Sequence, residues 1–271
     1  AIALELERIA VHLATLTGLA TDIAWQQPAA TYQRLRTALI NATQPVCGKR
    51  FGKGWIRPGR AAPLNDTLRA DLLQTLQAFL RDFVQVNTLV CASRSARARL
   101  QGVGVVSTQA ATELGLTGVV ARASGVALDL RQCLPNGLHG LHQPVIEVTG
   151  DCWARMHVRM REAQASTEWL LDRLRDPALD LDCPAPFTPA TQAPEWPLTP
   201  HTLGLSVVEG VRGPVMVALE TGPAGQLVHA KVQDPSLANW FGLAQALRGQ
   251  QISDFPICNK SFDLSYCGND L

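Results

Sequence analysis

The sequence has no dominant charge and no long apolar run. Lys and Arg number 24 against 23 Asp and Glu in 271 residues, so no overall charge attracts nucleic acid or an anionic membrane surface. No apolar run approaches the roughly 18 to 20 residues of a membrane-spanning helix, and the first residues lack the basic-then-apolar pattern of a secretion signal. We therefore expect a cytoplasmic protein with no nucleic-acid partner and no membrane span of its own.

The chain also lacks the motifs typical of disulfide, zinc and nucleotide sites. Its cysteines are odd in number, widely scattered and never spaced as CxxC: Cys47, Cys91, Cys133, Cys152, Cys183, Cys258 and Cys267. This pattern suggests neither a disulfide framework nor a zinc ribbon and favours reduced cytoplasmic thiols. We find no glycine-rich phosphate loop, no repeat and no Ser/His/Asp arrangement. His139 and His142 are three apart, but flanking glycines argue against a helical metal pair.

Apolar periodicity predicts a mainly helical protein. Leu6, Ile9 and Leu13 recur in steps of three and four, which indicates one buried stripe of an amphipathic helix. The same pattern and the capping residues predict helices near residues 1–25, 31–43, 66–100, 151–175 and 235–248. Within the fourth of these, Asp151, Arg155 and Arg159 have the spacing of an ion-paired face. These helices are long enough to form a bundle core.

The remaining segments predict loops and one small sheet. "CGKRFGKGWIRPGR" is a basic loop with a short strand at Trp55 and Ile56, and Ser107 begins a short helix that Gly118 ends, followed by irregular chain. Strand composition appears at 203–208, 215–219 and 227–232. The fold class is therefore mainly α with a small antiparallel β-sheet (α+β).

We expect one domain made of successive parts. Residues 1–176 form the helical core and residues 201–271 contain the sheet, the C-terminal helix and a loop. Between them, residues 177–200 contain seven prolines, which excludes regular helix and predicts an extended wrap over the surface.

Several segments occur in a recognisable order: "ALELERIAVHLATL", "FGKGWIRPGR", "GVGVVSTQAATELGLTGVVARASGVALDLRQ", "GDCWARMHVRMREA" and "DPSLANW" with "DFPICNKSFDLSYCGND". The chain resembles the large subunit of membrane-bound [NiFe] hydrogenases and its relative, the 49 kDa subunit of respiratory complex I. The resemblance covers essentially residues 1–270, and an energy-converting hydrogenase-related group that has lost the metal pattern is the nearest match. It implies a hydrogenase-large-subunit-like helical bundle, with the family's N-terminal region preceding Ala1.

In the hydrogenases of this family, two CxxC pairs hold a nickel-iron centre. The first pair would precede Ala1, and the second corresponds to "DLSYCG" at residues 263–268, where Ser265 and Gly268 stand at the ligand positions. Serine is a hard oxygen donor with a high pKa and glycine has no side chain, so the resemblance argues against a nickel-iron centre. Cys258 and Cys267 are the remaining weak candidates for a metal pair, and two buried inert thiols are the favoured alternative.

The resemblance also implies a partner. Arg57, Arg122, Asp129 and Arg131 match motifs that line the family's interface with a small iron-sulfur subunit, whose cluster is the cofactor we expect nearby. The alternative is that these arginines are structural and hold irregular chain. We expect no directly bound cofactor, other subunits of a membrane-associated redox complex as further partners, and a peripheral location on the cytoplasmic face of the inner membrane.

Three functional hypotheses follow. The first is a nickel-free large-subunit-like component of an oxidoreductase complex, which would not act as a hydrogenase on its own. The second is a catalytic [NiFe] large subunit whose upstream cysteines are absent, or a complex I-like subunit that shapes a quinone pocket. The third is a split-gene fragment that serves as a binding module. Nickel content separates the first hypothesis from the catalytic alternative.

Overall fold

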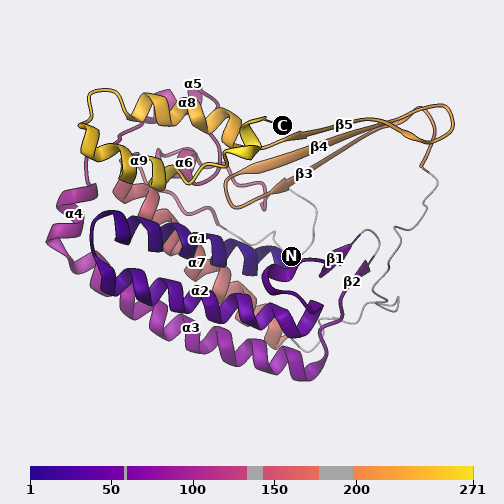
Figure 1. Cartoon of the computed structure of the whole chain (residues 1–271), viewed down its shortest axis with the longest axis horizontal. Coiled ribbons are helices and arrows are strands. Elements are labelled where there is room, and N and C mark those ends of the chain that lie inside the picture. The colour runs from indigo at the N-terminus through magenta and orange to yellow at the C-terminus, as the bar shows by residue number, and fades with distance from the viewer. Residues whose placement is uncertain (58–59, 133–142, 177–197, 271) are drawn as a thin grey trace.

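The computed structural model describes residues 1–57, 60–132, 143–176 and 198–270. Long helices form its main layer: α1 (Ile2–Asp22), α2 (Gln26–Cys47), α3 (Asp66–Ala92) and α7 (Cys152–Arg175). α1 packs against α2 and α7, and α3 packs against α2 and α7 (Figure 1). α4 (Arg94–Leu100) continues α3 after a break at Ser93. The predicted bundle is confirmed.

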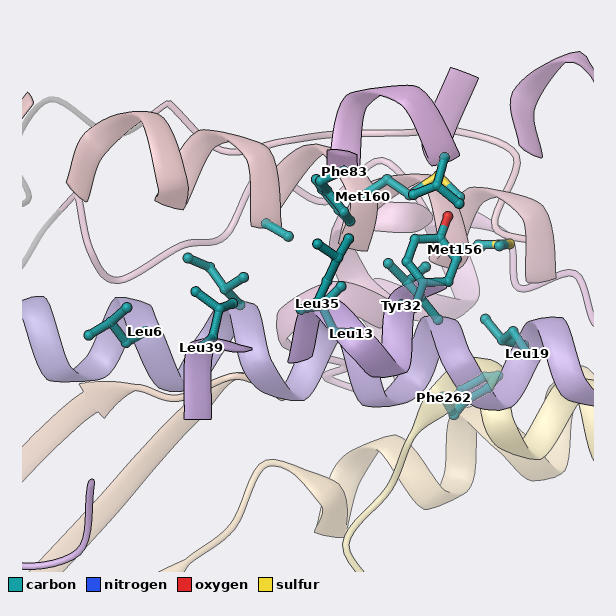
Figure 2. Packing of buried hydrophobic residues seen from close by; sticks show 14 of the residues in the cluster. Leu6, Leu13, Leu19, Tyr32, Leu35, Leu39, Phe83, Met156, Met160 and Phe262 are labelled. Carbon is teal, nitrogen blue, oxygen red and sulfur yellow. The ribbon is translucent and has the colours of Figure 1, made fainter. Parts of the chain in front are cut away.

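The bundle core contains the residues that the apolar spacing singled out. Leu6, Leu13 and Leu19 of α1 face Tyr32, Leu35 and Leu39 of α2, with Phe83, Met156, Met160 and Phe262 from other helices around them (Figure 2). All of these side chains are at most 3% exposed. Asn65 caps α3 by accepting the Leu68 N–H at 3.0 Å, and Asp151 caps α7 by accepting the Ala154 N–H at 2.7 Å.

Shorter helices cover one side of this layer (Figure 1): α5 (Thr108–Glu113), α6 (Gly118–Ala123), α8 (Ser236–Ala246) and α9 (Phe255–Phe262).

The predicted helix stop at Gly118 is wrong, because Gly118 begins α6. Its φ is +62° and a Cβ there would lie 2.0 Å from the Arg212 carbonyl oxygen, so a close backbone approach requires glycine. All of α6 is buried. A six-residue helix without a polar face has no amphipathic pattern, which is why irregular chain was predicted there.

The predicted sheet is confirmed as β3 (Leu203–Glu209), β4 (Pro214–Thr221) and β5 (Leu227–Gln233), antiparallel in that order. It extends away from the helices (Figure 1), and most of its side chains are at least partly exposed. Its inner end is different, because Glu209 at the end of β3 is only 1% exposed. A second, two-stranded hairpin pairs β1 (Ile56–Arg57) with β2 (Arg60–Ala61).

Three short 3-10 helices complete the described elements: η1 (Arg50–Gly52), η2 (Ile252–Asp254) and η3 (Cys267–Asp270). Most of the proline-rich segment, at 177–197, lies outside the described residues, as do His139 and His142. Among the described helices, none combines the length and the hydropathy needed to cross a bilayer.

Candidate functional site

Charged side chains from distant parts of the chain meet inside the protein. They come from α1, α6, the loop after α6, α7 and the inner end of β3. We call them the buried ionic network: Glu5, Arg8, His12, Arg122, Asp129, Arg131, Glu162 and Glu209. None is more than 3% exposed. A group of charges so deeply buried is stable only if its members neutralise one another.

Arg122, in the last turn of α6, links three of the elements. Its Nε donates to Glu162 Oε1 of α7 at 2.6 Å, and its Nη1 donates to Glu209 Oε1 of β3 at 3.1 Å. Nη1 also donates to the Leu128 carbonyl at 2.9 Å. Burial opposes the charged guanidinium, but the carboxylates, Glu162 first, outweigh it and raise the pKa of Arg122. Arg122 is therefore a permanent buried cation that ties β3 and α7 to α6.

Arg131 forms the second centre of the network. Its Nε and Nη2 donate to the two carboxylate oxygens of Asp129 at 2.9 and 2.6 Å, in a bidentate pair. Its Nη1 donates to Glu5 Oε2 at 3.2 Å, and Ser166 Oγ donates to the same oxygen at 2.6 Å. Burial raises the pKa of Asp129, but the hydrogen bond from Arg131 and the charge of Arg122 lower it further, so the net pKa is below the usual value. The segment 129–131 is thereby fixed to α1.

Arg8 connects α1 to the sheet. It forms an ion pair with Glu5 at 3.3 Å, one turn earlier on the same helix. Its Nη2 donates to the Glu209 carbonyl at 2.8 Å and its Nη1 donates to the Gly210 carbonyl at 3.1 Å. The inner end of β3 thus has its backbone bound by Arg8 and its side chain bound by Arg122.

His12 and Glu162 form the deepest pair, with Nε2 and Oε2 2.9 Å apart. Burial lowers the pKa of His12 to about 4 despite the neighbouring carboxylate, so this imidazole is neutral near pH 7. Burial opposes ionisation of Glu162, yet Arg122 and the His12 hydrogen bond hold its pKa well below the usual range. An ionised Glu162 only accepts, so neutral His12 must donate from Nε2. Its Nδ1 then keeps a lone pair with no partner among the described residues.

Glu209 behaves differently from Glu162. Burial raises its pKa above the usual value, and the attraction of Arg122 does not fully offset this effect. The network as defined contains four carboxylates and three guanidinium groups, and the guanidinium of buried Arg159 also acts on Glu162. The arrangement can therefore fix a local electrostatic field in the interior.

The C-terminal segment at residues 263–268 contains the two positions that correspond to the family's metal ligands, Ser265 and Gly268. Gly268 is buried, and a Cβ at this position would lie 2.5 Å from Asp234 Cγ, so any side chain there would require Asp234 to move. The Ser265 hydroxyl instead accepts the Gly268 N–H at 3.0 Å. Within the described ranges, no three His, Cys, Asp or Glu side chains are grouped as a metal would require. The residues present do not fit a thiolate-bound nickel-iron centre.

Comparison with known proteins identifies the family. The family model described as "respiratory-chain NADH dehydrogenase, 49 Kd subunit" matches residues 22–180, which is more than half of the chain. The chain belongs to this 49 kDa subunit family.

Curated NADH-quinone oxidoreductase subunits and a hydrogenase are among the relatives. The chain is 31% identical to one such oxidoreductase subunit from Clostridium beijerinckii, over 60% of this chain and 45% of that protein. It is 26% identical to the equivalent protein from Dinoroseobacter shibae, over 97% of this chain and 70% of that protein. A carbon monoxide-induced hydrogenase of Rhodospirillum rubrum is 27% identical to this chain, over 97% of this chain and 71% of that protein. The chain spans about half the length of the first of these relatives. The predicted resemblance to complex I 49 kDa subunits and to hydrogenase large subunits is confirmed.

The structure brings together some of the predicted site residues of this 49 kDa family member. Arg122, Asp129 and Arg131 join the buried ionic network, whereas Arg57 lies in the β1–β2 hairpin and is partly exposed. For Arg122 and Arg131, the geometry matches the structural alternative, in which arginines hold irregular chain. A partner-facing role for the four residues remains a prediction.

The two weak metal candidates are in different environments. Cys258 is fully buried beside Cys152, with the two sulfur atoms 3.8 Å apart. Cys267 is exposed, so the prediction of a second buried thiol is wrong at this position. Its sulfur lies 3.5 Å from Ser265 Oγ, and it is the first residue of η3.

Sequence reasoning missed five of the eight network residues: Glu5, Arg8, His12, Glu162 and Glu209. A signal was present, because Glu5, Arg8 and His12 repeat in steps of three and four, as the apolar stripe of α1 does. Polar residues beside an apolar stripe are usually solvated, so this spacing alone does not indicate burial. Contacts with α7 and with the end of β3 bury these residues in the fold.

Proposed function

We propose that this chain is a subunit of a membrane-associated oxidoreductase complex, that it packs against an iron-sulfur subunit, and that it holds no nickel-iron centre. Its attachment to the cytoplasmic face of the membrane would be peripheral and would depend on partner subunits. Membership of the 49 kDa family supports a role in a redox complex. The observation that carries the nickel-free part is Gly268, which stands at a ligand position and is packed directly against Asp234.

The segment around the β1–β2 hairpin supports the docking part of the proposal. Lys49, Arg50 and Lys53 are exposed cations, and the nearby side chains of Phe51 and Ile56 are 60% and 61% exposed. Exposed apolar side chains within a basic rim are typical of protein interfaces. An iron-sulfur cluster with its thiolates is a net anion, so a basic docking surface suits a subunit that carries one.

The network would serve this interface as a rigid support. Arg122 and Arg131 are held by several charge-assisted hydrogen bonds each, which fixes their positions in the interior. Because four carboxylates surround the three guanidinium groups, the network carries no net positive charge, and in this proposal it serves the interface by fixing the position of the chain behind it.

Docking is tested by substitution in the hairpin. We expect Arg57→Ala, in complex with its native partners, to reduce co-purification of the iron-sulfur subunit by about tenfold, because loss of an interfacial arginine commonly costs about 1–2 kcal/mol. Quantitative mass spectrometry of affinity-purified complexes gives the ratio of the two subunits. Arg248→Ala is the matched control, since Arg248 is an exposed arginine after α8. Equal recovery of the iron-sulfur subunit with all three proteins would contradict docking through the hairpin.

A further inference from the structure

Two buried thiols face each other where α7 begins. Cys152 is the first residue of α7 and Cys258 lies on α9, and both side chains are inaccessible to solvent. Their sulfur atoms are 3.8 Å apart. Formation of a disulfide, with an S–S bond of about 2.05 Å, needs a closure of about 1.8 Å shared between two side chains.

A buried cation without a carboxylate lies beside this thiol pair. The predicted ion pairing of Asp151, Arg155 and Arg159 is wrong, because the Asp151 carboxylate accepts backbone N–H groups of Gly102 and Ala154. Arg155 is fully buried, and within the described part of the chain none of its nitrogens lies within 4 Å of a carboxylate.

The contacts of Arg155 leave one group that can neutralise it. The guanidinium donates to the carbonyls of Gly150 and Gly104 at 2.7 and 3.0 Å and to Ser261 Oγ at 2.8 Å. The guanidinium also lies over the Phe262 ring, 4.3 Å from its centroid, and Nη2 is 3.4 Å from Cys152 Sγ, which is the one ionisable acidic group among these contacts. Because an uncompensated buried charge is costly, the cation favours ionisation of this thiol.

We propose that Cys152 and Cys258 form a redox-active dithiol, in which a small hydroperoxide oxidises the Cys152 thiolate and Cys258 acts as the resolving thiol. The Cys152 thiolate attacks one oxygen of hydrogen peroxide, the O–O bond breaks, and a sulfenic acid and hydroxide form. The Cys258 thiol then displaces the sulfenic hydroxyl, so the S–S bond forms and water leaves. In total the pair loses two electrons and the peroxide gains them.

The electrostatics of the pair support these separate roles. The hydrogen bond with Cys258 and the charge of Arg155 outweigh burial and lower the pKa of Cys152 to about 6. The Cys152 contact, burial and the charge of Asp254 raise the pKa of Cys258, despite Arg155. Cys152 therefore carries a larger fraction of the reactive thiolate at pH 7 than an ordinary cysteine, and Cys258 stays protonated as the resolving thiol.

The surrounding chain limits which oxidant can reach the pair. Gly104 has φ +63°, and a Cβ there would lie 2.6 Å from Cys258 Sγ and 3.5 Å from Cys152 Sγ. Backbone thus covers the sulfur atoms directly. Hydrogen peroxide, which is close to water in size, needs only a local opening to enter, whereas a glutathione-sized disulfide does not fit. This inference does not rest on the proposed function.

Peptide mapping after oxidation tests the dithiol. The full chain carrying Cys267→Ser, which removes the exposed thiol, is treated with hydrogen peroxide at pH 7 and alkylated. Digestion with trypsin and a glutamyl endopeptidase leaves Cys152 in residues 148–155 and Cys258 in residues 249–260, without Cys133. We expect a disulfide between these two peptides as the main product, forming at least tenfold faster with hydrogen peroxide than with glutathione disulfide.

A second variant separates the roles of the two sulfur atoms. In Cys258→Ser the disulfide should be absent, and dimedone should label Cys152 as a sulfenic acid. In the protein that retains Cys258, the rate of disulfide formation should fall as the pH drops below about 6. The proposal is overturned if Cys152 and Cys258 both remain alkylatable thiols under a peroxide dose that fully oxidises Cys267 in the unsubstituted chain.

Discussion

Replacing Arg122 with methionine is expected to lower the free energy of unfolding by about 3–5 kcal/mol, because removal of one partner leaves buried charges uncompensated. Methionine keeps much of the side-chain volume but removes the donors that bind Glu162 and Glu209. Those carboxylates stay in the interior with no solvent to replace the guanidinium. Urea denaturation followed by circular dichroism at pH 7 measures the effect.

The matched control is the same substitution at the surface. Arg34 and Asp82 form an ion pair at 2.6 Å, but their side chains are 62% and 41% exposed. Arg34→Met should therefore cost at most about 1 kcal/mol. If Arg122→Met were no more destabilising than Arg34→Met, the buried ionic network would not be the rigid support that we infer.

His12 should make stability depend on pH in the acidic range. Burial lowers its pKa from 6.5 in the unfolded chain to about 4 in the fold. Between these values the unfolded state binds more protons, so acidification favours unfolding. The contribution of His12 should be fully present above pH 6.5 and should be lost as the pH falls to about 4. Its size is about 3 kcal/mol, from a pKa difference of about 2.5 units.

Paired titrations isolate this contribution. The free energy of unfolding of wild type and His12→Gln is measured at intervals from pH 7.5 to 4, and the difference between the two proteins should shrink toward acidic pH. His229→Gln provides the control, because His229 is exposed on β5. A constant difference across the range would show that His12 is not held neutral by burial.

The sequence predicted the elements well where their chemistry is local. Steps of three and four in apolar residues identified α1, α3 and α7, and Asn65 and Asp151 cap the last two as expected. α8 begins one residue later than the predicted start at residue 235, because Pro235 precedes the helix and Asp234 accepts the Ser236 N–H at 2.7 Å. α6 had no local signal, because its position depends on the backbone approach at Gly118.

The candidate site could be predicted only in part. The resemblance to a known family pointed to Arg122, Asp129 and Arg131, and the structure joins them. Their counterions on α1 and α7 have the same spacing as solvated residues of an amphipathic helix, so sequence could not distinguish them. Glu209 had no distinguishing pattern at all. Its burial arises because only the inner end of β3 reaches the helices.

Metal analysis of the purified full-length protein tests the central claim most directly. The C-terminal ligand positions hold Ser265 and Gly268, so neither offers a thiolate, and Gly268 packs against the Asp234 side chain. We therefore predict that elemental analysis by inductively coupled plasma mass spectrometry will find far less than one nickel per chain. One nickel per chain that disappears on Cys267→Ser, while the variant stays folded, would contradict the account and identify a catalytic [NiFe] subunit.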